Sequence, residues 1–169
     1  PSSAASPSSR NSLAICTKSV TVIMPCTRRK LSTTGKKPLI SEGLVACGGC
    51  GAGEVRIIHS AADLEGLSDP PYVLVMHQSL VEAVGALKQA SAILVDLGNP
   101  ADHLSCVARE YEIPMLTGLA EATKKLKNGA FVMTNGEKGM VFPATPEEME
   151  IHRKHHLQKT AHWEERQTL

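Results

Sequence analysis

The stretch "SAILVDLGNPADHLSCVAREYEIPMLTG" (residues 91–118) indicates how this chain folds. It begins with a run of apolar residues that ends at Asp96, which is typical of a buried strand. After a polar turn, Asp102 stands where it can cap a helix that runs to about Glu112. Pro114 ends that helix, and "PMLTG" follows as a short strand. Strand, helix and strand in this order predict an α/β fold.

The residues before this stretch continue the pattern. "LVACGGCGAGEVRII" joins an apolar start to a glycine-rich bend and a strand over roughly 53–59, where the glycines indicate close backbone approaches. "YVLVM" at 72–76 is a second strand, apolar on both faces. A helix follows, for which we predict Ser79 as the cap. Its expected buried face consists of Leu80, Val81, Val84 and Leu87.

The residues after the stretch predict a closing hairpin and one long helix. "LAEATKKLKNG" is a short helix with Gly129 beyond its end, and "AFVMTNGEKGMVF" is a hairpin that turns at Asn135-Gly136. The last segment begins with Thr145 as N-cap, Pro146 at the first helical position and Glu148 in the capping-box place. The sequence therefore predicts an α/β domain with a central mixed sheet over residues 42–143 and a C-terminal linker helix over 144–169.

Residues 1–41 differ from the rest in composition. They carry seven of the 18 Lys and Arg residues, none of the 17 Asp and Glu residues, and many Ser and Pro. Such a segment is a disordered basic arm, the end of an upstream linker or a transit peptide, and the sequence leaves these open. Because residues 1–40 have no periodic apolar face apart from "SVTVIM", we expect a chain that begins at Ser41 to fold as well as the full one.

Composition limits the classes of protein that fit. A chain of 169 residues has room for one ordinary domain, and its apolar runs fall well short of the roughly 20 residues that span a bilayer. The five Cys suggest reduced thiols and a cytoplasmic location. Cys47-Gly48-Gly49-Cys50 has the spacing of a redox or metal pair, but its glycines favour a tight turn. The basic arm lacks interleaved aromatic residues, so we do not expect it to bind nucleic acid.

His103 is the candidate reactive residue. It lies in the first turn of the predicted helix, where unpaired backbone N–H groups and a partial positive charge stabilise an anionic group. A neutral imidazole is a nucleophile near pH 7, so a phosphoryl group on its ring would lie within reach of those N–H groups. Taken from the residues alone, an ordinary surface histidine fits the same position.

The segment "GNPADHLSCVAREYEIPMLTG" resembles the phosphohistidine segment of the phosphoenolpyruvate (PEP)-utilising enzymes, which include phosphoenolpyruvate synthase, pyruvate phosphate dikinase, rifampin phosphotransferase and sugar-transport enzyme I. "CGGCGAGEV" resembles the family's opening strand and "LKNGAFVMTNGEKGMVF" its closing hairpin, so the resemblance covers Leu44 to Phe142. The residues that match the phosphohistidine segment in register are Gly98, His103, Ala108, Arg109, Glu110, Ile113, Pro114 and Gly118.

The resemblance implies a swivelling β/β/α phosphohistidine domain. His103 would carry the phosphoryl group, supported by Gly98, Asp102, Leu104 and Arg109, although a structural role suits Arg109 better. The domain itself would bind no cofactor and no metal, and Mg and ATP would bind to partner domains. Those partners would be a nucleotide-binding domain and a PEP- or pyruvate-binding domain. A barrel alone takes about 250 residues, so this chain by itself should turn over no substrate.

Three departures from the family pattern are informative. Asn99-Pro100 replaces a glycine and a variable residue, Ala101 stands where a Thr hydroxyl often holds the phosphate, and Asp102 puts a carboxylate beside the reactive ring. The last two changes disfavour a phosphoryl dianion by removing a donor and adding a like charge. An interaction module that keeps the fold but is not phosphorylated is therefore the alternative function.

The remaining histidines are weaker candidates. His152 and His156 have the i, i+4 spacing of a metal pair, but the helix around them is charged and has no Cys nearby, so a solvated linker is the better interpretation. His59 and His77 flank predicted strands, and we expect them to be partly buried packing residues rather than ligands.

Overall fold

The computed structural model describes residues 35–67 and 69–167. The described strands form one seven-stranded sheet in the order β1-β5-β4-β3-β2-β6-β7. The strands are β1 (Leu44–Cys47), β2 (Cys50–Ile58), β3 (Tyr72–Gln78), β4 (Ala90–Leu97), β5 (Met115–Thr117), β6 (Phe131–Asn135) and β7 (Met140–Pro143). From β2 to β5 neighbouring strands are parallel, whereas β1, β6 and β7 pair antiparallel. The predicted mixed sheet is confirmed.

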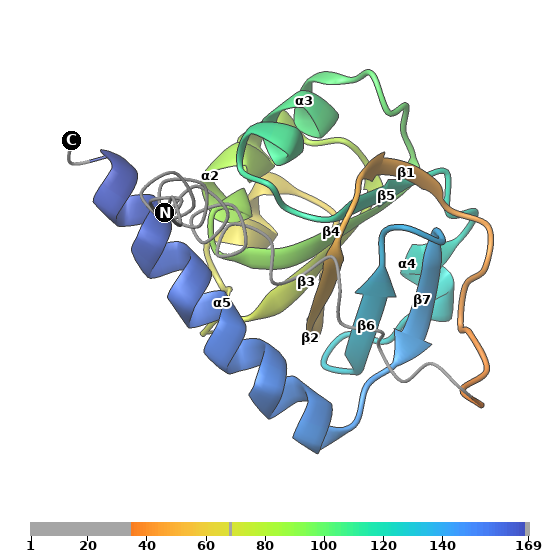
Figure 1. Ribbon diagram of the computed structural model, residues 1–169. Coiled ribbons are helices and arrows are strands. Elements are labelled where there is room, and N and C mark those ends of the chain that lie inside the picture. Colours follow the sequence, from red (N-terminus) through yellow and green to blue (C-terminus); the bar gives the residue numbers. More distant parts are fainter. Residues whose placement is uncertain (1–34, 68, 168–169) are drawn as a thin grey trace, which may run out of the picture. The chain divides into compact units, whose positions relative to one another are not determined.

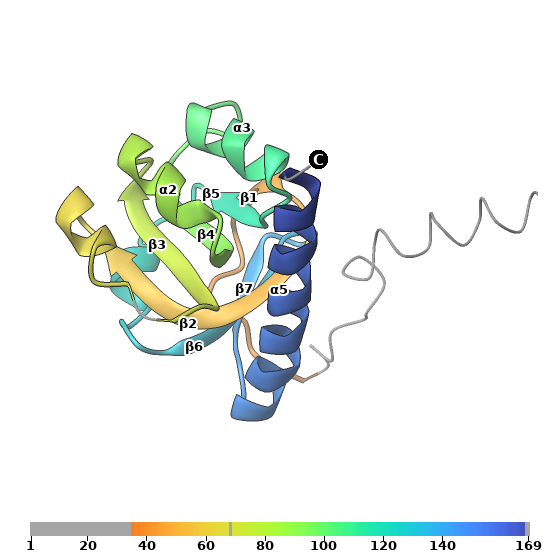
Figure 2. The ribbon, with the colours of Figure 1, turned by 90° about the vertical axis from the view of Figure 1, so that its left-hand side faces the viewer.

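The helices cover both faces of the sheet (Figure 1). They are α2 (Val84–Leu87), α3 (His103–Glu110), α4 (Ala122–Lys125) and α5 (Pro146–Gln167), with short 3-10 turns η2 (Ala61–Leu64) and η3 (Val81–Ala83). α2 and α3 lie over one face and α4 over the other, while α5 runs alongside β2 (Figure 2). None of the described helices is long and apolar enough to span a membrane.

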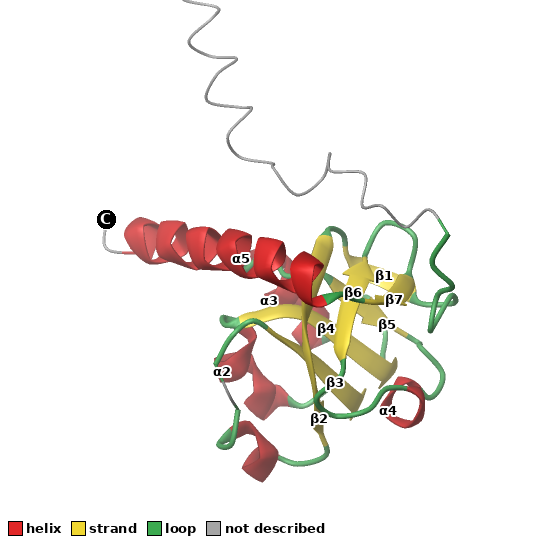
Figure 3. Ribbon diagram, turned by 90° about the horizontal axis from the view of Figure 1, so that it is seen from below, coloured by secondary structure: helices red, strands yellow, loops and turns green. Residues whose placement is uncertain are grey.

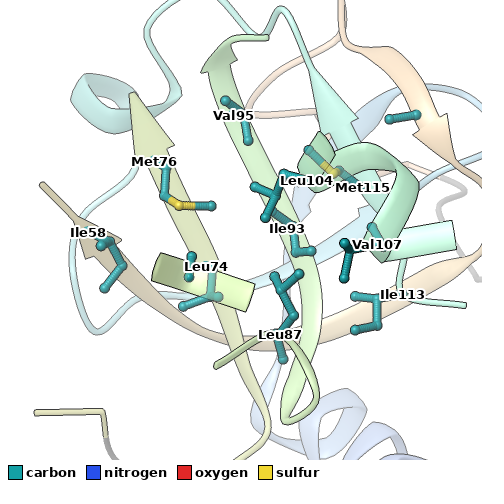
Figure 4. Close-up of a cluster of buried hydrophobic side chains, with 14 of the residues drawn as sticks. Ile58, Leu74, Met76, Leu87, Ile93, Val95, Leu104, Val107, Ile113 and Met115 are labelled. Carbon is teal, nitrogen blue, oxygen red and sulfur yellow. The ribbon is translucent and has the colours of Figure 1, made fainter. Parts of the chain in front are cut away.

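Two apolar clusters explain why strands β3 and β4 read as continuous apolar runs. The cluster under α2 and α3 contains Leu74, Met76, Ile93, Val95 and Leu104 (Figure 4). The cluster under α4 contains the alternate residues of the same strands, such as Val73, Val75 and Leu94, all fully buried. A strand that is buried on both faces needs apolar side chains at every position.

The segment 39–47 joins the two edges of the sheet. The Leu39 N–H donates to the Val141 carbonyl of β7 at 2.7 Å, and the Gly43 N–H donates to the Gly139 carbonyl in the turn before β7 at 3.0 Å. Directly afterwards, β1 pairs with β5 at the other edge (Figure 3). Ile40 is only 4% exposed. The folded part therefore begins before residue 42, where the sequence pattern places the boundary, while residues 1–34 lie outside the described residues.

The glycine-rich start of β2 allows the close approach that the sequence predicts. A Cβ atom at Gly51 would lie 2.1 Å from the Ser91 carbonyl oxygen at the start of β4. Nearby, the Ser91 hydroxyl donates to the Ala52 carbonyl at 2.8 Å. The chain bends at Gly49, between the two cysteines, and φ of Gly49 is +116°.

The region after β3 differs from its prediction. The chain forms η3 and a single turn of α2 rather than one helix capped by Ser79, and the residue before η3 is Leu80. The Ser79 hydroxyl instead bonds to Asp102. Val81, expected on the buried face, is 66% exposed. By contrast, the Thr145–Glu148 capping box of α5 is present as predicted.

Candidate functional site

The candidate site lies where the parallel strands β3, β4 and β5 end. The loop from Gly98 to Asp102 joins β4 to α3, and Ser79 follows β3. Ligands of open α/β sheets bind outside the carboxyl ends of the strands, which is this edge. His103 is the first residue of α3, and its side chain is exposed at the surface.

Asp102 caps α3 and also ties the loop together. One carboxylate oxygen accepts the Ser105 N–H at 2.9 Å, and the other accepts the Ser79 hydroxyl at 2.8 Å and the Asn99 N–H at 3.3 Å. Partial burial alone would raise the pKa of Asp102, but these hydrogen bonds outweigh it and hold the pKa below its ordinary value. The carboxylate that adjoins His103 is therefore charged, and both of its oxygens are occupied.

Capping by Asp102 leaves two backbone donors free at the start of α3. The first four N–H groups of a helix have no partner within it. The Ser105 N–H donates to the Asp102 side chain and the Cys106 N–H to the Asp102 carbonyl at 3.1 Å. The N–H groups of His103 and Leu104 have no acceptor within the described part of the chain. These two donors are available to an anionic group beside the His103 ring.

The loop before His103 is held by Asn99, a residue that departs from the family pattern. Its side-chain carbonyl accepts the Ala101 N–H at 2.9 Å, and its backbone carbonyl accepts the Ser105 hydroxyl at 3.0 Å and the Asp102 N–H at 3.0 Å. A Cβ atom at Gly98 would lie 3.3 Å from Cγ1 of Val95 and 3.4 Å from an Asp102 oxygen, so this position is tight. The loop is therefore held by polar contacts within the chain.

Leu104 and Arg109 hold α3 in place. The Leu104 side chain is 2% exposed and packs in the cluster under α3, so its contribution to the site is its backbone N–H. The Arg109 guanidinium donates to the Pro100 carbonyl at 2.8 Å, to the Ala46 carbonyl at 3.2 Å and to the Cys106 sulfur at 3.4 Å. It links α3, the loop and β1.

Sequence reasoning assigned Ser79 to the cap of another helix and missed the pair formed by His77 and Asp96. Nδ1 of His77 lies 3.4 Å from an Asp96 oxygen, and Asp96 also accepts the Ala122 N–H at 2.5 Å and the Thr123 hydroxyl at 2.6 Å. The His77 side chain is 61% exposed, and His59 is exposed as well, so the prediction that both are partly buried packing residues is wrong. The sequence signal for this pair was a polar residue near the end of β3 and another near the end of β4, which are adjacent strands.

The other candidate ligands do not gather into a site. Among residues 35–67 and 69–167, no group of three or more His, Cys, Asp or Glu side chains is placed to hold a metal ion. Cys47 and Cys50 do not form a disulfide with each other, and burial raises the pKa of Cys47 although Lys159 and Arg109 oppose it. Two surface hollows, of about 600 and 310 Å³, are lined by other residues, and the side chain of His103 is exposed at the surface.

Comparison with known proteins gives the family. Residues 68–139 match the model for the PEP-utilising enzyme mobile domain. A probable phosphoenolpyruvate synthase of Pyrococcus horikoshii is 36% identical over 123 residues, which are 73% of this chain and 15% of that protein. Phosphoenolpyruvate synthase of Pyrococcus furiosus is 38% identical over 104 residues, 62% of this chain and 13% of that protein. This chain therefore spans about 15% of the length of the relatives it matches.

A solved structure agrees with the fold. The crystal structure of Thermococcus kodakaraensis aconitase X in its holo-form aligns with a TM-score of 0.51 and 24% identity, over 62% of this chain and 97% of that chain. At this identity the likeness is one of fold alone. The family match covers the strands, the loop and the helix that carry His103. The chain therefore belongs to the PEP-utilising enzyme family and contains its mobile domain.

Proposed function

We propose that this domain is a phosphoryl carrier, with His103 as the residue that accepts and returns the phosphoryl group. The observation that carries the proposal is an exposed imidazole at the first position of α3, beside two backbone N–H groups without an acceptor in the described chain. An exposed carrier residue can enter the site of another domain, whereas a buried one cannot. The mobile-domain match supports the same role.

The proposed transfer is a nucleophilic displacement at phosphorus. A ring nitrogen of neutral His103 donates its lone pair to phosphorus, and the bond between phosphorus and the leaving oxygen of ATP or PEP breaks. The leaving oxygen keeps the electron pair of that bond. The N–H groups of His103 and Leu104 would stabilise the phosphoryl oxygens, and the reverse displacement would pass the group on.

The donor and acceptor sites belong to other domains in this proposal. The chain spans only 15% of its P. horikoshii relative, so the remaining length of such a protein has room for a nucleotide-binding domain and a PEP- or pyruvate-binding domain. Mg and ATP would bind there, and the mobile domain would swivel between the two sites. This chain alone would then show no steady-state turnover of ATP or pyruvate.

Labelling tests the proposal. The chain is incubated with radiolabelled ATP or PEP together with the domains that bind them, and we expect label that is labile in acid and stable in alkali. His103→Ala should abolish the label and leave the melting temperature nearly unchanged, because the side chain is exposed. His59→Ala, at another exposed histidine, is the matched control. Label that persists in His103→Ala would exclude His103 as the carrier.

The charge of Asp102 favours a second candidate function, a module that is not phosphorylated. The carboxylate lies next to His103 in sequence and its pKa is lowered, so a phosphoryl dianion would form beside a full negative charge. The test uses partner domains that are able to label another mobile domain. If these domains leave the unmodified chain unlabelled, the result favours this second function.

A further inference from the structure

The helix α5 packs against the domain through a face that is rich in histidine. The half-buried positions of α5 recur at helical spacing and are Glu148, Met149, His152, His155, His156 and Thr160. The two large aliphatic residues Ile151 and Leu157 are 50% and 53% exposed. Among the described side chains of this face Met149 is the one large apolar residue, and the other five are polar.

His156 is the most confined of these groups. Its Nε2 atom is buried and has no hydrogen-bond partner among the described residues. Burial lowers the pKa of His156, the nearby backbone of Gln89 opposes this, and the Lys159 ammonium lowers the pKa further. A neutral ring leaves one lone pair unsatisfied there, which costs less than burying an unpaired cationic N–H.

The charged groups around His156 do not neutralise the positive charge that a protonated ring would carry. On α5 itself, Lys159 donates its Nζ to the Glu112 carbonyl just after α3. Next to Gln89, the Lys88 ammonium lies 5.6 Å from the centre of the Tyr111 ring. On β2, the strand that α5 contacts, Glu54 and Arg56 form an ion pair at 3.1 Å. Of these charges, the one that acts on the His156 ring is the positive charge of Lys159.

The other titratable groups near this part of the domain include three on the packed face of α5 and the thiol of Cys47. His152 and His155 share its packed face and have interactions of their own. Cys47 is in the field of both Lys159 and Glu112, and its raised pKa keeps it a neutral thiol. At the start of α5, Glu148 is paired with Lys36 at 2.6 Å. None of these groups offers a free negative charge to a protonated His156.

The connection between β7 and α5 has the form of a hinge. The Ala144 N–H donates to the Phe131 carbonyl at 3.0 Å, which is the last backbone tie to the sheet. The Thr145–Glu148 capping box lies within the helix start and would move with it. The contacts of His156 and Lys159 lie about three to four turns away from this hinge.

We propose that α5 is a pH-sensitive element, docked on the domain while His156 is neutral and released about the hinge at Ala144 when His156 is protonated. In the released helix the ring has its ordinary pKa of about 6.5. Because the docked pKa is lower, docking is complete above that pH and weakens below it. The ratio of docked to released helix should fall by up to about tenfold for each pH unit, until the docked pKa is reached. The direction in which α5 leaves the domain would then depend on pH.

Backbone ¹⁵N relaxation of the full chain at pH 7.5 and pH 5.5 tests this. We expect the amides of residues 150–165 to become mobile on the nanosecond timescale at pH 5.5, while those of β3 and β4 stay rigid. His156→Gln, which cannot take up a proton, should keep α5 rigid at both pH values. His162→Gln is the matched control, because His162 is 63% exposed on the same helix, and it should behave like the unmodified chain.

Two outcomes would overturn the proposal. One is an α5 that stays rigid at pH 5.5 in the unmodified chain, and the other is an unchanged pH response in His156→Gln. If the Gln variant does not dock at pH 7.5, the titration of His156 itself, followed by ring proton shifts in the unmodified chain, decides the question. A pKa at or above the ordinary value would exclude the switch, and a lowered pKa that coincides with the onset of α5 mobility would support it.

Discussion

The Ser79 hydroxyl donates to Asp102 at 2.8 Å and so ties the end of β3 to the first turn of α3. The two residues are 23 positions apart, and the bond crosses the edge where the parallel strands end. The start of the helix that presents His103 is therefore fixed from two sides, by its own loop and by the neighbouring strand. Positioning of His103 depends on a residue outside its motif.

Replacing Ser79 tests this tie. Ser79→Ala leaves one Asp102 oxygen with only the long bond from Asn99, so we expect the free energy of unfolding to fall by about 1–2 kcal/mol. Urea unfolding measures this change. Ser41→Ala, at an exposed serine, should lie within about 0.5 kcal/mol of the unmodified chain. An equal effect of both changes would contradict the tie.

Asp102 makes the stability of the α3 start depend on pH. Its pKa is lowered in the folded chain, so its contribution is present in full above about pH 3.9 and is lost as pH falls through the lowered folded value. Asp102→Asn keeps a good cap without a titrating group. We expect its unfolding free energy to depend less on pH between about 5 and 2 than that of the unmodified chain. Urea unfolding at several pH values gives this dependence. If the unfolding free energies of the two chains change equally with pH, the cap does not need the charge.

The segment before residue 42 should matter for stability. Ile40 is buried in the cluster under α4, and Lys36 pairs with Glu148 at 2.6 Å. We expect a chain that begins at Ser41 to melt well below one that begins at Gly35, and Ile40→Ala to cost about 2–5 kcal/mol. Leu39→Ala, at a residue that is 44% exposed, is the control. Equal melting temperatures for the two truncated chains would restore the boundary that the sequence predicts.

Replacement of glycine by alanine should have opposite effects on stability at Gly51 and at Gly85. A Cβ atom at Gly51 meets the Ser91 carbonyl oxygen at 2.1 Å, so Gly51→Ala forces a backbone shift and should cost about 2–3 kcal/mol or more. Gly85 lies within α2 with nothing near its Cβ position, so Gly85→Ala should be neutral or stabilise by up to about 1 kcal/mol. Thermal unfolding of both variants checks this. A tolerated Gly51→Ala would mean that the strands are not this close.

The sequence predicted features that depend on residues close together in the chain and missed those that depend on residues far apart in it. The Asp102 cap, the Thr145–Glu148 capping box and the turn after Asn135 each depend on residues within a few positions, and all are present. Ser79 was assigned to a local cap because its true partner is 23 residues away. Ile40 was missed because its partner strand lies about 100 residues later and a single buried residue has no period.

Arg109 allows the structural and the phosphate-binding roles to be separated. Its guanidinium donates to the Pro100 and Ala46 carbonyls, and a charged donor lost from such contacts costs about 1.5–3 kcal/mol. We therefore expect Arg109→Ala to lower the melting temperature. If the role is structural, the fraction of chain labelled at His103 should be unchanged at a temperature where the variant is folded. Arg109→Lys keeps the charge but not the forked geometry, so it should recover little of the stability. A variant that stays stable but loses the label would assign Arg109 to the phosphoryl group instead.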